Sequence, residues 1–187
     1  MRLLIILSIL SQCFQTIEQS VIKLEFTMTI QNKSISDLSS YSGNIVIHGD
    51  CFILSLMENE IAYDGKSLFV YNRNDEEITI STPDESDLLD INPFLYAKYV
   101  STNAQITEQF IKESNQQQII LLPTEHENSV EKIKLFFDID NEITLPQRIE
   151  MIERKQQTII TINQKEKLPS TPKFVLEKDN VHINDIR

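Results

Sequence analysis

The residues of this chain that could do chemistry are few and lie far apart. The three histidines, His48, His126 and His182, fall in separate segments and lack a metal-ligand spacing such as His-x-x-x-His. The sequence also lacks a glycine-rich phosphate loop and the Gly-x-Ser-x-Gly turn that presents a nucleophilic serine. These observations favour a protein that is not an enzyme and that holds neither a metal nor a cofactor.

Acidic clusters are the remaining candidates for an acid–base or calcium site. Asp75-Glu76-Glu77 and Asp84-Glu85 have the composition of a solvated turn and of a helix N-terminus, which carboxylates stabilise. Residues 138–142 resemble a calcium loop only in part, because they lack the glycine and the trailing glutamate of an EF-hand. We therefore expect turns and a helix start at these positions.

Residues 1–13 have the features of a signal peptide. Arg2 supplies a positive charge, and Leu3 to Leu10 form an apolar stretch that is shorter than the roughly 20 residues of a membrane span. Ser11 and Cys13 are small enough to precede a cleavage site. The alternative is a lipoprotein signal with an acylated Cys13, which Gln12 fits poorly because a small residue usually stands there. The sequence thus predicts an exported chain.

Length, charge and cysteines restrict the rest of the chain. The 187 residues fit a signal peptide and a single domain at 14–187. The net charge of −11 argues against a nucleic-acid partner, because nucleic acids bind basic surfaces. Without Cys13, Cys51 has no partner for an intramolecular disulfide, and its apolar neighbours predict a small buried side chain.

The stretch from Tyr41 to Ile80 predicts consecutive antiparallel strands joined by tight turns, because short apolar runs alternate with Gly, Asn and Asp. In Cys51–Leu54 and Leu68–Tyr71 the apolar residues are consecutive, so both faces of these strands need cover. Two readings stay open here, a strand buried on both faces or a strand with one face lining an apolar cavity. Residues 24–30 instead alternate, which indicates a half-buried strand.

Two short helices are predicted to interrupt the strands. Thr82 can cap the first, with Pro83 at its first position and Glu85 completing a capping box. Asn92-Pro93 repeats the cap-and-proline pattern for the second. The apolar residues that follow both starts predict that these helices pack over the sheet.

Several of these segments resemble the LolA-like periplasmic carriers of outer-membrane lipoproteins, most closely the variants of Bacteroidetes-type bacteria. Tyr63 to Tyr71 is similar to the family's Asp-Gly-Lys-Thr-Leu-Trp-x-Tyr hairpin, with Phe69 at the tryptophan position. Ile91-Asn92-Pro93-Phe94 is similar to the family's Asn-Pro segment, and Val181 to Arg187 resembles a common C-terminal ending.

The resemblance implies a mainly β fold, an unclosed antiparallel half-barrel with a few short helices as a lid over its concave side. It implies a periplasmic, monomeric carrier that binds lipoprotein acyl chains in an apolar cavity and moves lipoproteins from the inner to the outer membrane. Its expected partners are an inner-membrane ABC-type release complex and an outer-membrane acceptor. The alternative is an exported binding protein for another lipid or apolar small molecule.

The resemblance also implies site residues. The expected cavity wall is Ile45, Ile47, Phe52, Leu54, Leu56, Phe69 and Tyr71, and the expected lid residues are Leu88, Leu89, Phe94 and Leu95. His48 stands where proteobacterial members have an arginine that bonds the lid, so we expect altered lid control there. With residues 1–13 removed, the helix that covers the barrel in those members would be nearly absent.

Overall fold

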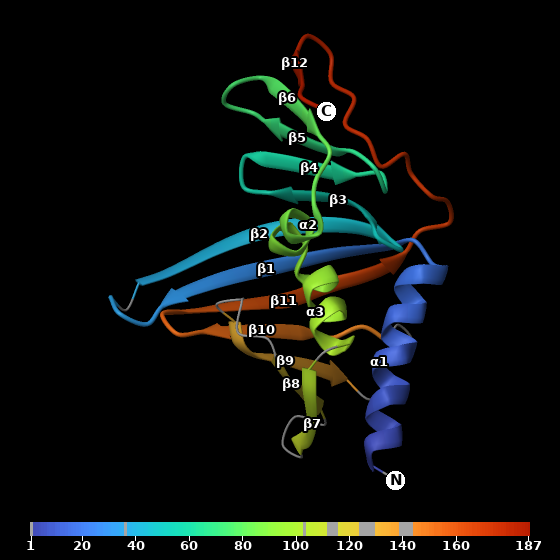
Figure 1. Ribbon diagram of the computed structural model, residues 1–187, viewed down its shortest axis with the longest axis vertical. Coiled ribbons are helices and arrows are strands. Elements are labelled where there is room, and N and C mark those ends of the chain that lie inside the picture. Colours follow the sequence, from blue (N-terminus) through green and yellow to red (C-terminus); the bar gives the residue numbers. More distant parts are fainter. Residues whose placement is uncertain (1, 36, 103, 112–115, 124–129, 139–143) are drawn as a thin grey trace.

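The computed structural model describes residues 2–35, 37–102, 104–111, 116–123, 130–138 and 144–187, which form one sheet and three helices (Figure 1). The elements in chain order are α1 (Arg2–Gln19), β1 (Ile22–Asn32), β2 (Asp37–His48), β3 (Cys51–Leu56), β4 (Asn59–Tyr63), β5 (Leu68–Asn72), β6 (Glu77–Ser81), α2 (Glu85–Ile91), α3 (Pro93–Thr102), β7 (Ala104–Ile111), β8 (Gln116–Pro123), β9 (Val130–Asp138), β10 (Arg148–Glu153), β11 (Gln156–Lys167) and β12 (His182–Asp185). His126 and residues 139–142 lie outside the described residues.

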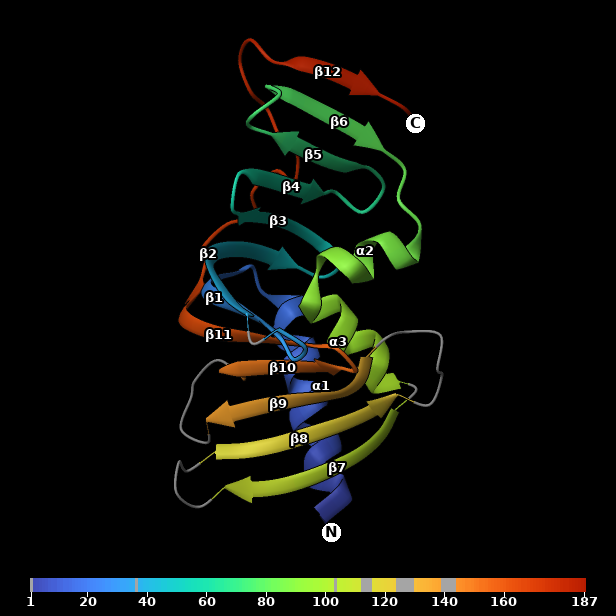
Figure 2. The same cartoon turned by 90° about the vertical axis from the view of Figure 1, so that its left-hand side faces the viewer.

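The sheet is open and almost entirely antiparallel. In the described part of the chain its twelve strands follow the order β12-β6-β5-β4-β3-β2-β1-β11-β10-β9-β8-β7, and only β12 and β6 pair in parallel. The two end strands, β12 and β7, lie at opposite ends of the stack (Figure 2). The predicted mainly β, unclosed antiparallel half-barrel is confirmed.

β1 lies near the middle of the sheet, and its side chains alternate as predicted. Leu24 and Phe26 are buried, whereas Glu25 between them is exposed. The register to β11 shifts between Glu25 and Phe26, which marks a β-bulge. Opposite Phe26, β2 carries Gly43, where an added Cβ would lie 2.6 Å from the phenylalanine ring. This glycine is required because the ring occupies the space of a side chain.

The two predicted helices between β6 and β7 are present and cover one face of the sheet (Figure 2). Asn92 caps α3 as predicted, accepting a hydrogen bond from the Phe94 amide at 3.0 Å. The predicted cap of α2 is wrong, because Asp84 and not Thr82 is the cap. Asp84 accepts from the Asp87 amide at 2.9 Å and its own amide donates to Asp87 at 3.1 Å, a reciprocal box that Thr82 lies too far upstream to form.

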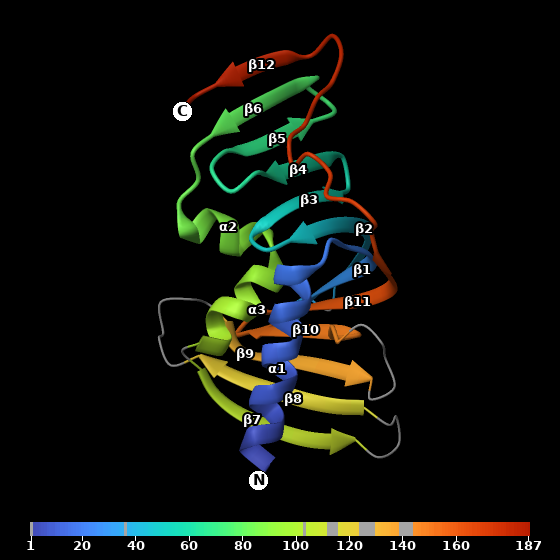
Figure 3. The same ribbon diagram turned by 90° about the vertical axis from the view of Figure 1, so that its right-hand side faces the viewer.

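α1 lies beside α3 on the same face of the sheet (Figure 3). It buries Leu10, Cys13 and Ile17 in the hydrophobic core, so in the full chain this part of the sheet has the helical cover that we expected to be nearly absent. Burial raises the pKa of the Cys13 thiol to about 12. No helix in the described part of the chain, α1 included, reaches the length and hydrophobicity of a membrane span.

The C-terminal residues return across the sheet to its far edge. Phe174 is buried on the way, and Lys178 bonds Glu60 at 2.7 Å. β12 then joins β6, where the His182 amide donates to Glu76 and the Ile186 amide donates to Ile80, both at 2.9 Å. The C-terminus thus supplies the last strand of the sheet.

Candidate ligand-binding cavity

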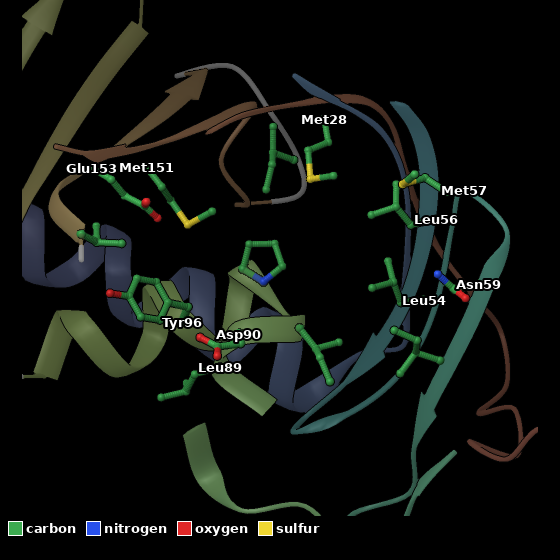
Figure 4. A pocket seen from close by; sticks show the side chains of 15 residues that line it. Met28, Leu54, Leu56, Met57, Asn59, Leu89, Asp90, Tyr96, Met151 and Glu153 are labelled. Carbon is green, nitrogen blue, oxygen red and sulfur yellow. The ribbon is translucent and has the colours of Figure 1, made fainter. Parts of the chain in front are cut away.

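A cavity of about 400 Å³ lies between the helix-covered face of the sheet and the α2–α3 segment (Figure 4). It falls within the range of roughly 300–1,000 Å³ typical of small-molecule sites. The strands contribute Met28, Leu54, Leu56, Asn59, Ile61, Val130, Met151, Glu153 and Ile160, the β3–β4 turn contributes Met57, and the helical segment contributes Leu89, Asp90, Ile91, Pro93 and Tyr96. Most of this lining is apolar.

Strand register determines which side chains face the cavity. Leu54 on β3 is opposite Ile45 on β2 and Ile61 on β4, so these three side chains share one face of the sheet. Of the predicted wall, Leu54 and Leu56 line the cavity itself. The cavity surface thus includes two of the seven wall residues that the resemblance implied.

Three other predicted wall residues lie on the same face but outside the cavity. Ile45 and Ile47 are 1% exposed and Phe52 is 0% exposed, and all three belong to the packed core. Ile47 and Phe52 are paired neighbours near the end of α1, whose Ile17 carbonyl accepts from the Gly49 amide at 2.9 Å. These residues support the cavity from one side and do not form its surface.

The assignment of Phe69 and Tyr71 to the cavity wall is corrected by the register. Val70, between them, pairs with Ile61 and so faces the cavity side, which turns Phe69 and Tyr71 to the opposite face. There Lys178 of the C-terminal segment lies 5.0 Å from the centre of the Tyr71 ring. The apolar run Leu68–Tyr71 is consecutive because both faces of β5 are covered.

Among the predicted lid residues, Leu89 lines the cavity. Phe94 is 5% exposed and belongs to the core, where it anchors the start of α3. Leu88 and Leu95 are half-buried and pack against the core without lining the cavity. α2 has no buried residue at all, so it is held by fewer apolar contacts than α3.

Sequence reasoning missed the lining residues that come from distant strands. Met28 on β1 is opposite Ile160 on β11, and Met151 comes from β10. The alternation of β1 already placed Met28 on the same side as Leu24 and Phe26, which was the available signal. Met57 was not predictable in this way, because it lies in a turn with a positive φ of 57°.

An ion pair links α3 to the turn that follows His48, but it does not involve His48. The His48 Nδ1 atom is buried and has no hydrogen-bond partner among the described residues. Lys98 of α3 instead binds Asp50, in the turn after β2, at 3.1 Å, and Glu18 of α1 at 2.6 Å. Burial works against the charge of Lys98, but the hydrogen bonds to Glu18 and Asp50 outweigh it and raise its pKa. We call these three residues the Lys98 clasp.

Comparison with known proteins agrees with this architecture. The family model of the outer membrane lipoprotein carrier protein LolA matches residues 20–173. No curated protein matches the chain. An uncharacterized conserved protein from Thermus thermophilus has a similar structure, with a TM-score of 0.57 at 9% sequence identity, covering 95% of this chain and 97% of that one.

Two further solved structures are similar over most of their length. A LolA superfamily protein from Nitrosomonas europaea shares 13% identity at a TM-score of 0.49, covering 88% of this chain and 94% of that one. The lipoprotein LppX from Mycobacterium tuberculosis shares 9% identity at a TM-score of 0.48, covering 90% and 98%. Since the family model spans most of the 187 residues, the chain belongs to the family of the outer membrane lipoprotein carrier protein LolA.

Proposed function

We propose that this protein is an exported carrier that binds the acyl chains of lipoproteins in the cavity under α2 and α3 and moves them from the inner to the outer membrane. The observation that supports this most is the apolar cavity itself, because a family of carriers needs an unfilled space on a folded chain. Leu54, Leu56 and Leu89 place aliphatic surface on two sides of that space.

The physical need for a carrier comes from the acyl chains. Each methylene group that leaves water gains about 0.8 kcal/mol, so a lipidated protein does not cross an aqueous compartment unaided. The cavity offers apolar side chains to such a chain, and three of them are methionines, Met28, Met57 and Met151. Methionine adapts its shape readily, which suits chains of different length and position.

The cover over the cavity has one firmly held part and one loosely held part. α3 is fixed by the buried Phe94 and by the Lys98 clasp. α2 has no buried residue and contributes Leu89 and Asp90 to the cavity. Entry of an acyl chain would therefore displace α2 first, at low cost, while α3 keeps its place. Such a cover also keeps binding moderate, as release to an acceptor requires.

Export through residues 1–13 belongs to this proposal, with the periplasm as the compartment. Its expected partners are an inner-membrane release complex and an outer-membrane acceptor, and the carrier would act as a monomer. Cleavage after Cys13 would remove Leu10 and Cys13 from the core. The apolar sheet surface beneath them would then join the cavity. N-terminal sequencing of the exported protein distinguishes cleavage at this position from acylation of Cys13.

Filling the cavity tests the proposal directly. Met151→Trp places a larger ring in the cavity and should weaken binding of an S-palmitoyl peptide by at least tenfold, measured by displacement of an uncharged fluorescent probe. Leu38→Trp is the matched control, since Leu38 is 64% exposed and should leave binding unchanged. Equal affinity of the two variants would overturn the assignment of this cavity as the acyl site.

A second candidate is binding of another lipid or apolar small molecule, which a cavity of about 400 Å³ also accommodates. Depleting the protein in its cells separates the two functions. A lipoprotein carrier predicts that lipoproteins accumulate at the inner membrane. Normal lipoprotein distribution, with an apolar molecule found on the purified protein by native mass spectrometry, would favour the second candidate.

A further inference from the structure

Charged side chains in the cavity lining indicate which polar group is attached to the acyl chain of the ligand. We infer that the cavity selects acyl groups whose attached polar part is positively charged, as in an acylated basic peptide, and that Asp90 and Glu153 make this selection. The inference rests on the proposed function and names the chemical class of its cargo.

The charge of the lining is one-sided. Among the 15 lining residues, the only charged ones are Asp90 and Glu153, and the described lining contains neither lysine nor arginine. Asp90 belongs to α2 and Glu153 to the end of β10, so one carboxylate lies on the cover and one on the sheet (Figure 4). The polar part of a ligand that leaves the cavity between cover and sheet therefore meets negative charge on both sides.

Within the described residues, no salt bridge involves the side chain of Asp90 or Glu153. Lys33 approaches Glu153 but donates to its backbone carbonyl oxygen, at 2.6 Å. The buried carboxylate of Glu150, by contrast, is paired, because Lys134 binds it at 3.3 Å and Arg148 also contacts it. The two cavity carboxylates thus remain available to a cationic ligand.

The surroundings increase the effect of these charges on a bound ligand. Apolar walls lower the local dielectric and concentrate the field of nearby charges at the opening. An exposed ion pair contributes modestly, so two such pairs would give a preference of about three- to tenfold for a cationic over an anionic ligand. Salt should reduce this preference, because it screens charges that remain in contact with water.

The selection would have a clear use in a lipid-rich compartment. An apolar cavity alone accepts the acyl chain of any lipid, anionic phospholipids included. Carboxylates in its lining disfavour a phosphate or a free fatty acid and favour a peptide with lysine or arginine next to its acylated residue. The same two residues would thus keep membrane lipids from occupying a carrier meant for lipidated protein.

Three lipopeptides with one acyl chain test this inference. Each has an acetylated N-terminus and an S-palmitoyl cysteine, followed by three lysines, three serines or three glutamates. Their affinities are measured by displacement of N-phenyl-1-naphthylamine at low salt and at 1 M salt, where the Debye length is about 3 Å. The proteins compared are the wild type, the Asp90→Asn/Glu153→Gln variant and a Glu85→Gln/Glu166→Gln variant of equal net charge. Glu85 and Glu166 are exposed and lie on α2 and β11 outside the cavity lining.

We expect the lysine peptide to bind the wild type about three- to tenfold more tightly than the glutamate peptide. This ratio should persist in the Glu85→Gln/Glu166→Gln variant, and it should approach one in the Asp90→Asn/Glu153→Gln variant and at 1 M salt. Equal affinities in the wild type, or an equal loss in both variants, would overturn the inference alone. Failure of the serine peptide to bind at all would overturn the proposed function and this inference with it.

Discussion

The face of the sheet that carries the helices has a filled half and a hollow half, and the same strands build both. On β1, Ile22 and Leu24 are fully buried, whereas Met28 lines the cavity. On β3, Phe52 is fully buried and Leu56 lines the cavity. What changes along the strands is the cover, because in the full chain α1 packs Leu10, Cys13 and Ile17 into the core at one end. A binding site thus arises here from helix placement more than from a change in strand composition.

The largest expected difference between the two halves is in stability. Phe52→Ala removes a fully buried ring from the filled half and should lower the free energy of unfolding by about 3–5 kcal/mol. Met28→Ala, in the hollow half, removes a half-buried side chain that already borders empty space, and we expect a loss of about 1 kcal/mol or less. Urea unfolding measures both. Similar losses would show that the two halves do not differ in packing.

Cysteine labelling compares the accessibility of Cys13 in α1 with that of Cys51 at the start of β3. Because burial raises the pKa of Cys13 to about 12, almost no thiolate exists at pH 8, and alkylation should be at least about a hundredfold slower than for a free cysteine. Cys51, which is half-buried and has its pKa raised mainly by burial, should react sooner. Timed alkylation of the full chain with mass spectrometry gives both rates. Fast labelling of Cys13 would mean that α1 leaves the filled half.

Packing around Gly43 gives a smaller effect. Gly43→Ala places a Cβ where the Phe26 ring lies 2.6 Å away, so the ring must shift at the border of the two halves. We expect a loss of about 1–3 kcal/mol, the usual cost of overpacking. Measuring the Phe26→Leu and double variants by urea unfolding checks the cause. The double variant should lose less stability than the sum of the losses of the two single variants. If the loss equals that sum, contact with the Phe26 ring is not the cause.

The Lys98 clasp should contribute least to stability. The Lys98 side chain is 35% exposed and its partners are 48% and 66% exposed, so Lys98→Met should cost about 1 kcal/mol or less. Because its folded pKa is raised, this contribution is complete below the usual lysine pKa of about 10.4 and is lost as the pH rises through the folded value. The clearer readout is hydrogen exchange in α3, which should become faster. Unchanged exchange would show that the clasp does not hold the cover.

The fold and part of the cavity could be predicted from the sequence. The resemblance indicated an open antiparallel sheet with helices over it, and it implied Leu54, Leu56 and Leu89 among the residues around the cavity. Phe69 and Tyr71 were misplaced because four consecutive apolar residues give no sign of which pair faces inward. Only the pairing of Val70 with Ile61 decides that question.

Other features depend on contacts between residues far apart in sequence. Met151 meets Met28 at the cavity only because β11 pairs with both β1 and β10. Asp90 and Glu153 have the local pattern of ordinary surface carboxylates, so neither drew attention. Lys98 was missed for the same reason, since its partners lie in α1 and in the turn after β2. Local patterns therefore predicted the strands and helices but not the contacts between side chains of different elements.

The parallel pairing of β12 with β6 affects the tendency of the protein to self-associate at high concentration. A strand at the border of a sheet offers unpaired amides that can recruit a second molecule. Here the tail of the same polypeptide occupies that border on β6, and it is short and carries His182, Asp185 and Arg187. Removing the few residues of β12 would thus expose the edge of β6 and make the protein prone to polymerise.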